Sequence, residues 1–187
     1  MTADQQARQD EEGPRKHESA KARKMKNTFE YSVQDEAGTE RLAAALARVL
    51  PLQAVIALHG TLGAGKTRFV QALAAAAGFE RSAVVSPTFV LVQTYAGRRP
   101  IHHFDAYRLR DEDEFLALGA DEYLASVGWS IIEWAERVER ALPSERLDIR
   151  IEVTGETGRR FEVQGTGPEC EAVVDRLNGE WGMGNGE

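Results

Sequence analysis

The sequence predicts an α/β fold in which helices flank a central, mostly parallel sheet. A short uncharged run, Gln53–Leu58, is typical of a buried parallel strand. A glycine-rich loop follows this run. The next segment, Arg68–Ala77, is rich in strong helix formers and stops before Gly78. The order strand, glycine loop, helix places the loop at a helix N-terminus, where free N–H groups and the helix dipole favour an anion.

The loop itself matches the phosphate-binding pattern G-x-x-x-x-G-K-[ST]. Its residues are Gly60, Thr61, Leu62, Gly63, Ala64, Gly65, Lys66 and Thr67. The glycines let backbone N–H groups approach phosphate oxygens, Lys66 supplies a positive charge, and the Thr67 hydroxyl can ligate Mg²⁺. A flexible glycine turn is the alternative, but it would leave Lys66 and Thr67 without a purpose. We therefore predict a P-loop three-layer fold that binds a nucleoside triphosphate.

The amino-acid composition limits the possible partners and the cellular compartment of the protein. The 187 residues fit one domain, and the net charge of −7 is uneven, because residues 1–26 carry +2 and the rest carries −9. An acidic body disfavours tight, autonomous binding to nucleic acid. The single cysteine, Cys170, excludes an internal disulfide and is consistent with a reducing compartment. With no apolar run of membrane-spanning length and no secretion signal, we predict a cytoplasmic protein without a membrane partner.

The N-terminal residues 1–26 contain almost nothing that could be buried, which predicts a disordered tail. Its basic residues could contact RNA or an acidic partner, although a solvated extension is the favoured interpretation. We expect one ATPase domain over residues 27–178 and a flexible, Gly-rich end over residues 179–187.

The first half of the domain contains further elements in order. Thr28–Val33 alternates polar and apolar residues like an edge strand. Asp35 can cap a helix that runs to about Leu50, where Pro51 ends it. After the loop and its helix, Ser86–Tyr95 is a turn leading into a strand. Ile101–Tyr107 is expected to return beside it as an antiparallel partner.

The second half begins with a predicted helix over Asp111–Ala117. Ser130–Trp134 is a short apolar strand that contains a carboxylate near its end. Arg146–Val153 and Arg160–Gln164 alternate cleanly and predict a hairpin with one solvated face. Glu169–Leu177 is expected to form a closing amphipathic helix.

Two acids could serve the chemistry of a bound phosphate. Glu133 lies at the end of its apolar strand, where a side chain would face the Mg²⁺, although it could instead form only an ion pair at the strand edge. Asp105 would share one strand face with His103 and Tyr107, followed by Arg108. That row could contact metal-bound water or the γ-phosphate, or it could be a hydrogen-bonded, half-buried strand.

Two more features are weaker when taken alone. The Ser86-Pro87-Thr88 turn could contact Mg²⁺ or the γ-phosphate as a switch, but such turns are common. Trp134 could cover the nucleotide, although packing in the core is the favoured interpretation.

Together these segments resemble the signature of one family. The loop Gly60–Thr67, then Ser86-Pro-Thr-Phe89, His103-Phe-Asp-Ala-Tyr-Arg108 and Ile132-Glu-Trp134 are similar in order and spacing to the TsaE (YjeE) proteins. The similarity runs from about Phe29 to Val163. It implies a small P-loop ATPase that uses ATP and Mg²⁺ in the threonylcarbamoyladenosine modification of tRNA. It also implies docking on a complex of TsaD and TsaB, so that tRNA is engaged only indirectly.

The resemblance also implies residue roles. It implies that the catalytic residues are Lys66, Asp105 and Glu133. It implies that Mg²⁺ is bound by Thr67 and Glu133. Nucleotide binding falls to the loop residues named above, to Arg68 and to Trp134. The switch residues would be Ser86, Thr88, His103, Tyr107 and Arg108.

The sequence departs from the family pattern in places, and other functions compete with this interpretation. Thr61 occupies a position where the family often has an acid, and residues 1–26 have no counterpart in shorter members. A small-molecule kinase would need an Arg-rich lid, for which only Arg108 and Arg110 are candidates. A GTPase is disfavoured because no guanine-reading Asn-Lys-x-Asp motif occurs. A nucleotide-gated assembly module with little hydrolysis also fits the sequence.

Overall fold

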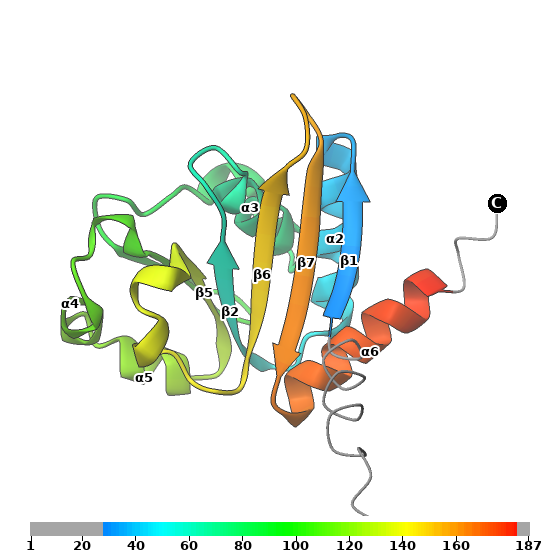
Figure 1. Cartoon of the computed structure of the whole chain (residues 1–187). Coiled ribbons are helices and arrows are strands. Elements are labelled where there is room, and N and C mark those ends of the chain that lie inside the picture. Colours follow the sequence, from blue (N-terminus) through cyan, green and yellow to red (C-terminus); the bar gives the residue numbers. More distant parts are fainter. Residues whose placement is uncertain (1–27, 183–187) are drawn as a thin grey trace, which may run out of the picture.

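A computed structural model describes residues 28–182, which form a seven-stranded sheet between helices (Figure 1). The strand order is β1-β7-β6-β2-β5-β4-β3, and the four central strands are mutually parallel. The strands are β1 (Thr28–Val33), β2 (Gln53–His59), β3 (Val92–Tyr95), β4 (Ile101–Asp105), β5 (Gly128–Glu133), β6 (Arg146–Val153) and β7 (Arg159–Thr166). Strands β1, β7 and β3 pair antiparallel with their neighbours. The predicted α/β architecture with antiparallel additions is therefore confirmed.

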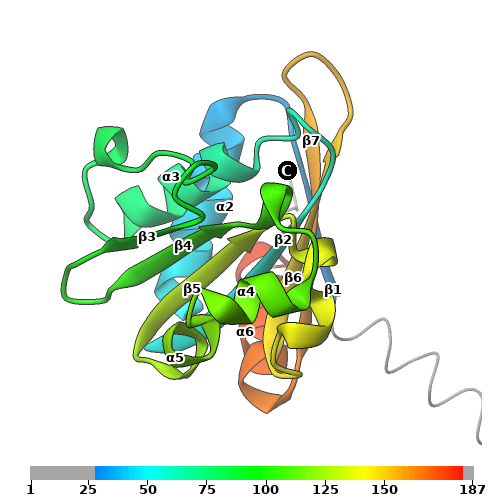
Figure 2. The ribbon, with the colours of Figure 1, turned by 90° about the vertical axis from the view of Figure 1, so that its left-hand side faces the viewer.

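Helices cover the two faces of the sheet unequally. The helices α2 (Glu36–Val49), α3 (Lys66–Ala76) and α6 (Pro168–Gly182) bury the larger apolar cluster on one face. The helices α4 (Glu112–Ala117) and α5 (Ala120–Ala125) contribute to a second cluster on the opposite face of the β2-β5-β4 half. Figure 2 shows α2 and α3 on one side of the sheet and α4 on the other. No helix of residues 28–182 covers the opposite face of β6, β7 and β1, as Figure 1 shows.

Strand β2 lies at the centre of the sheet because its side chains are apolar on both faces. Residues 54–58 are all buried, and the strand pairs with β5 on one side and β6 on the other. Register places Leu58 beside Glu133, and Glu133 beside Asp105. The carboxyl ends of three parallel strands therefore meet at one edge of the sheet, and the glycine loop starts at that edge.

Several predicted elements are found as expected. Asp35 caps α2 by accepting a hydrogen bond of 2.8 Å from the Gly38 N–H, and β1 lies at the sheet edge. The predicted hairpins are present as β3 with β4 and β6 with β7. Within residues 28–182, no helix is both long and apolar enough to traverse a membrane.

The strand predicted over residues 101–107 is shorter than expected. Strand β4 ends at Asp105, and residues 106–108 form a 3₁₀ turn because the Asp105 carboxylate accepts the Tyr107 N–H at 3.0 Å. His103 and Asp105 share a face as predicted, but the placement of Tyr107 in the same strand row was wrong. A carboxylate that caps its own following turn ends the strand.

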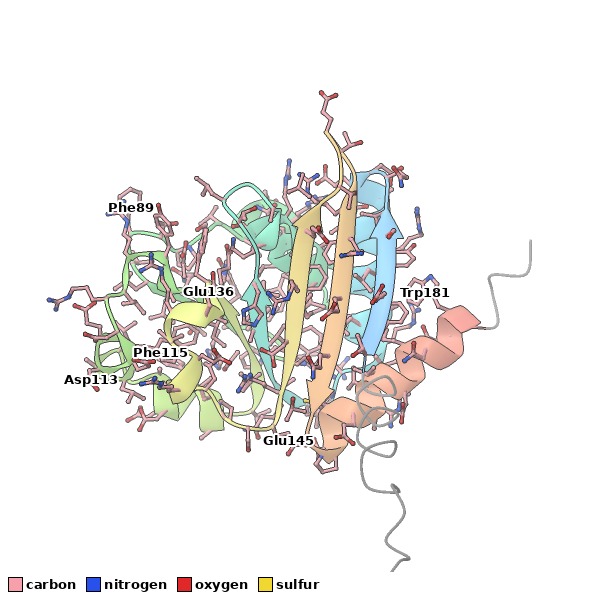
Figure 3. The ribbon with its side chains drawn as sticks, viewed as in Figure 1. Phe89, Asp113, Phe115, Glu136, Glu145 and Trp181 are labelled. Atoms are coloured by element: carbon pink, nitrogen blue, oxygen red, sulfur yellow. The ribbon has the colours of Figure 1, made fainter. Side chains whose placement is uncertain are left out.

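The closing helix is longer than predicted. It was expected over residues 169–177, but α6 continues to Gly182, and the Trp181 ring packs 5.4 Å from Phe29 and 4.9 Å from Tyr31, centroid to centroid. Figure 3 shows Trp181 at the end of α6 beside β1. The predicted boundary at residue 178 therefore lies inside a packed helix. Helix α5 was not predicted. The expected tail over residues 1–26 lies outside the described residues, as do residues 183–187.

Candidate functional site

The glycine loop joins β2 to α3 in a conformation that glycine alone adopts easily. Gly60 has φ +148°, and Gly65, directly before the helix, has φ +106°. Among the described residues no side chain caps the first turn of α3, so its N–H groups remain available at the loop. The loop therefore presents the anion-binding end of a helix at the sheet edge.

Lys66 is folded back into this loop. Its Nζ donates to the carbonyl oxygens of Gly60 at 2.7 Å and Thr61 at 3.1 Å, and it lies 3.5 Å from the centroid of the Trp134 ring. Burial lowers the pKa of the Lys66 ammonium, while Glu133, Glu136 and Asp105 act in the opposite direction. The cation is held by dipoles and an aromatic face rather than by a direct ion pair.

Glu133 is one of two buried carboxylates at the site. It is 3% exposed at the carboxyl end of β5. The Thr67 hydroxyl donates to both of its oxygens, at 2.8 and 3.0 Å, and His103 Nε2 lies 2.8 Å from Oε1. The side chain therefore faces the first turn of α3. It does not serve merely as an ion-pair partner at the strand edge.

Asp105 connects β4 to the Ser-Pro-Thr turn. Its Oδ2 accepts hydrogen bonds from Ser86 Oγ at 2.8 Å and Thr88 Oγ1 at 2.6 Å. The two hydroxyls also lie 2.7 Å from each other. The turn is thus fixed to the same sheet edge as the loop, through a carboxylate that is only 3% exposed.

A cavity of about 360 Å³ brings most of these residues together. It is lined by Leu62, Gly63, Gly65, Lys66, Thr67, Arg68, Ser86, Thr88, Asp105, Tyr107, Glu133 and Trp134. Gly60 and Thr61 instead line a neighbouring cavity of about 600 Å³, which shares Trp134 with the first. Trp134 therefore stands between the two cavities, in a left-handed conformation with φ +60°.

Besides Gly60 and Thr61, three expected site residues do not line the smaller cavity. Ala64 is fully buried. His103 has no exposed surface and lies behind Glu133. The Arg108 guanidinium is 4.5 Å from the Phe89 ring centroid, outside the cavity lining.

Sequence reasoning missed a cluster behind the loop. His59, the last residue of β2, has Nε2 2.8 Å from Asp148 Oδ1 and Nδ1 3.4 Å from Glu136 Oε2. Burial lowers the pKa of His59, but the hydrogen bonds to Asp148 and Glu136 outweigh this effect and raise it to about 9. Figure 3 shows Glu136 on the turn beside β6. No sequence signal marks the cluster, because its members come from three separate segments.

Arg159 was missed for the same reason. From β7 its Nε donates to the carbonyl oxygen of Ala64 at 2.8 Å, and Nη1 donates to that of Gly158 at 2.7 Å. The glycine loop is therefore supported by a strand that lies about 90 residues further along the chain.

The central parallel strand, the glycine loop on the helix N-terminus and the carboxylates at neighbouring strand ends define an α/β protein of the P-loop type. The crystal structure of YdiB from Bacillus subtilis has the same fold, with a TM-score of 0.69 and 29% identity, and the match covers 82% of this chain and 95% of that one. The family model described as "Threonylcarbamoyl adenosine biosynthesis protein TsaE" matches residues 33–161, and the chain belongs to the TsaE family.

Curated relatives agree with this assignment. The tRNA threonylcarbamoyladenosine biosynthesis protein TsaE of Bacillus subtilis (strain 168) is 40% identical over 125 residues, 66% of this chain and 77% of the relative. The protein of the same name from Treponema pallidum (strain Nichols) is 38% identical over 125 residues, 67% of this chain and 92% of the relative. The family expected from the four sequence segments is therefore confirmed.

Proposed function

We propose that this protein is a Mg²⁺-dependent ATPase that supports the threonylcarbamoyladenosine modification of tRNA while docked on a complex of TsaD and TsaB. One observation carries the proposal. The phosphate-loop residues Lys66 and Thr67 meet two buried carboxylates, Glu133 and Asp105, in a single cavity. The family membership and the names of the curated relatives supply the biological setting.

The loop fits the phosphates of a nucleotide. Within the described part of the chain, its N–H groups at the start of α3 have no capping side chain, and Lys66 Nζ donates only to loop carbonyls. Phosphate oxygens are stronger acceptors than these carbonyls because they carry charge. We therefore assign nucleotide binding to the loop, with Lys66 moving from the carbonyls to the phosphates.

The pair of Thr67 and Glu133 fits Mg²⁺. A hydroxyl and a carboxylate are hard oxygen donors, and a buried carboxylate with few partners gains from a cation. Within residues 28–182 no three His, Cys, Asp or Glu side chains gather as metal ligands, so phosphate oxygens and water would complete the coordination. When bound, the ion would neutralise charge on the transferred phosphoryl group.

Asp105 has a different task in this proposal. It accepts both hydroxyls of the Ser86–Thr88 turn and stands in register with Glu133. We assign it to hold that turn at the cavity, on the side where the attacking water would lie. In this assignment the neighbouring Glu133 is the metal ligand.

The rim of the cavity carries exposed apolar side chains, which supports docking on a protein partner. Leu62 is 79% exposed, Phe89 is 84% exposed, and Val90 and Tyr107 are also exposed. Figure 3 shows Phe89 at the periphery of the molecule, at the upper left. Grouped exposed apolar residues beside a site are typical of protein interfaces. A partner seated there would cover the cavity and exclude water.

The proposal is tested by measuring ATP hydrolysis by the purified chain in Mg²⁺, alone and with TsaD and TsaB from the same organism. We expect slow turnover alone and an increase with the pair. Glu133→Gln should abolish turnover in both conditions, because the metal-side carboxylate is lost. ATP binding without turnover in either condition would instead indicate a nucleotide-gated assembly module. No association with the pair would contradict the docking.

The docking surface has its own test. Phe89→Ser should leave hydrolysis by the isolated chain unchanged, since Phe89 does not line the cavity, and should reduce stimulation by the pair at least about tenfold. Val127→Ser is the matched control. Val127 is 63% exposed and directly precedes β5, so it lies at the amino end of that strand, away from the cavity at the carboxyl end. Equal stimulation of the two variants would show that the rim is not the docking surface.

A further inference from the structure

We infer that His103 is a positioning residue for Glu133: its imidazole holds the carboxylate in place from behind, so that the carboxylate stays directed at Thr67. The inference rests on the proposed function only in what Glu133 then does. The contact between the two side chains is an observation in its own right.

The contact is made deep inside the sheet. His103 has no exposed surface, and its Nε2 lies 2.8 Å from Glu133 Oε1. It stands beside Ile131 on the adjacent strand, on the same face as Glu133. Oε1 of the carboxylate therefore has a donor on each side, the imidazole within the sheet and the Thr67 hydroxyl on α3.

The pattern of hydrogen bonds fixes which ring nitrogen carries the proton. An ionised carboxylate can only accept, so Nε2 must donate to Glu133. Nδ1 is buried and has no partner among the described residues. With the proton on Nε2, Nδ1 is a bare acceptor, whereas a proton on Nδ1 would bury an unsatisfied N–H and also remove the donor to Glu133.

The neighbouring His102 shows what a purely structural histidine looks like in the same strand. It faces the opposite side of the sheet, and both of its nitrogens are paired, Nδ1 with Thr94 Oγ1 at 3.0 Å and Nε2 with Ser126 Oγ at 3.1 Å. It is 7% exposed. Within residues 28–182, the one side-chain hydrogen bond of His103 goes to the Glu133 carboxylate, so the imidazole is placed to orient that carboxylate.

Loss of this donor should loosen Glu133. The carboxylate would keep only the Thr67 hydroxyl, and its side chain could rotate away from the direction in which the metal is proposed to bind. Partners that orient a metal ligand are typically worth about 10–100-fold in metal affinity. Glutamine can replace the Nε2 donor at similar reach, whereas leucine cannot donate.

The test compares ATP affinity in Mg²⁺ with ATP affinity in EDTA, by calorimetry, for the full chain. In His103→Leu, the gain in ATP affinity on adding Mg²⁺ should be at least about tenfold smaller than in the unsubstituted protein. The ATP affinity of the variant in EDTA should stay within about twofold of the unsubstituted protein. His103→Gln should retain the gain. His102→Leu is the control: it should lower thermal stability without changing the gain. A gain that survives unchanged in His103→Leu would overturn the inference.

A second readout needs neither nucleotide nor metal. Nitrogen-15 NMR of the imidazole in the ligand-free protein should show the proton of His103 on Nε2, with a signal that shifts in Glu133→Gln. A proton on Nδ1, or a signal indifferent to Glu133→Gln, would overturn the inference, and this result stands even if His103→Leu does not fold. Absence of any Mg²⁺ effect in the unsubstituted protein would contradict the proposed function instead, and the NMR result would still decide the role of His103.

Discussion

At the scale of single residues, Gly60 shows two constraints acting at one position. The sequence motif explains this glycine by the approach of backbone to phosphate. The structure adds that a Cβ at Gly60 would lie 2.6 Å from the carbonyl oxygen of Ile151 on β6, and that its φ is +148°. Gly63 also has a positive φ, +79°, but nothing lies within 4 Å of its missing Cβ. Packing thus requires glycine at the first position, and backbone conformation alone favours it at the second.

This difference gives a prediction for the protein without nucleotide. Gly60→Ala should lower the free energy of unfolding by about 2–4 kcal/mol, because a clash with backbone adds to the strain of a positive φ. Gly63→Ala, the matched control, should cost about 1 kcal/mol. Urea denaturation of the two variants measures both. Equal losses would show that β6 yields to the added methyl group.

At the scale of elements, His59 links three segments behind the loop. It joins the end of β2 to Asp148 on β6 and to Glu136 on the 3₁₀ turn over residues 135–137. Only 12% of its side chain is exposed, whereas Glu136 is 46% exposed. The segment that carries Trp134 is therefore tied to the sheet through a charged imidazole.

The link should depend on pH in a defined window. The pKa of His59 is raised from 6.5 to about 9 in the folded protein, so its stabilisation is complete below about pH 6.5 and is lost as the pH rises through 9. The difference in unfolding free energy between the unsubstituted protein and His59→Gln should shrink by about 1–2 kcal/mol from pH 6.5 to 10, a value reduced for the solvent around Glu136.

Urea titrations at several pH values measure this difference. Titration of Tyr95 and Cys170, whose pKa values burial raises, affects both proteins alike and cancels. A difference that stays constant across the window would show that His59 is not protonated in the folded state.

At the scale of the whole molecule, the site draws on three adjacent parallel strands and the helix behind them. Register aligns the ends of β2, β5 and β4, and α3 starts from the same edge. A ligand bound there contacts segments that are distant in sequence. Binding should therefore stabilise the domain as one unit.

At a hundredfold excess over Kd, ATP with Mg²⁺ should stabilise the folded protein by about 2.7 kcal/mol. We expect this stabilisation to raise the melting temperature by about 5–10 °C. EDTA should reduce the shift, because the contribution of Thr67 and Glu133 is lost. Lys66→Ala should nearly abolish it. Calorimetric melting with and without each ligand measures the shifts, and an equal shift in EDTA would contradict the assigned metal site.

Local patterns predicted most of the fold and part of the site. The buried run of β2, the glycine motif and the alternating hairpins are local signals, so their elements were predicted within a few residues. Glu133 could be placed because ligands bind beyond the carboxyl ends of parallel strands. Asp105 was chosen from the alternation of faces along its strand, and its register beside Glu133 was not predicted. The predicted end of β4 was wrong, because the Asp105 carboxylate caps the turn that follows and so ends the strand.

Other parts could not be predicted because they depend on tertiary contacts. His59 meets Asp148, Arg159 reaches Ala64 and Trp181 reaches Phe29 across long sequence separations. His103 was expected among the switch residues, and only the structure shows that it lies behind Glu133. A pattern of residue types fixes which face a side chain takes, but it does not identify the neighbour on that face.

The pairing of β1 with β7 has a consequence for synthesis of the chain. Phe29 pairs with Val163, so β1 leaves the ribosome roughly 130 residues before its partner. At about 5–20 residues per second, β1 waits on the order of ten seconds with an unpaired edge. During that time Phe29 and Val33, both buried in the finished domain, lack their cover. Nascent chains of this protein are therefore exposed to strand-to-strand association until β7 has been synthesised.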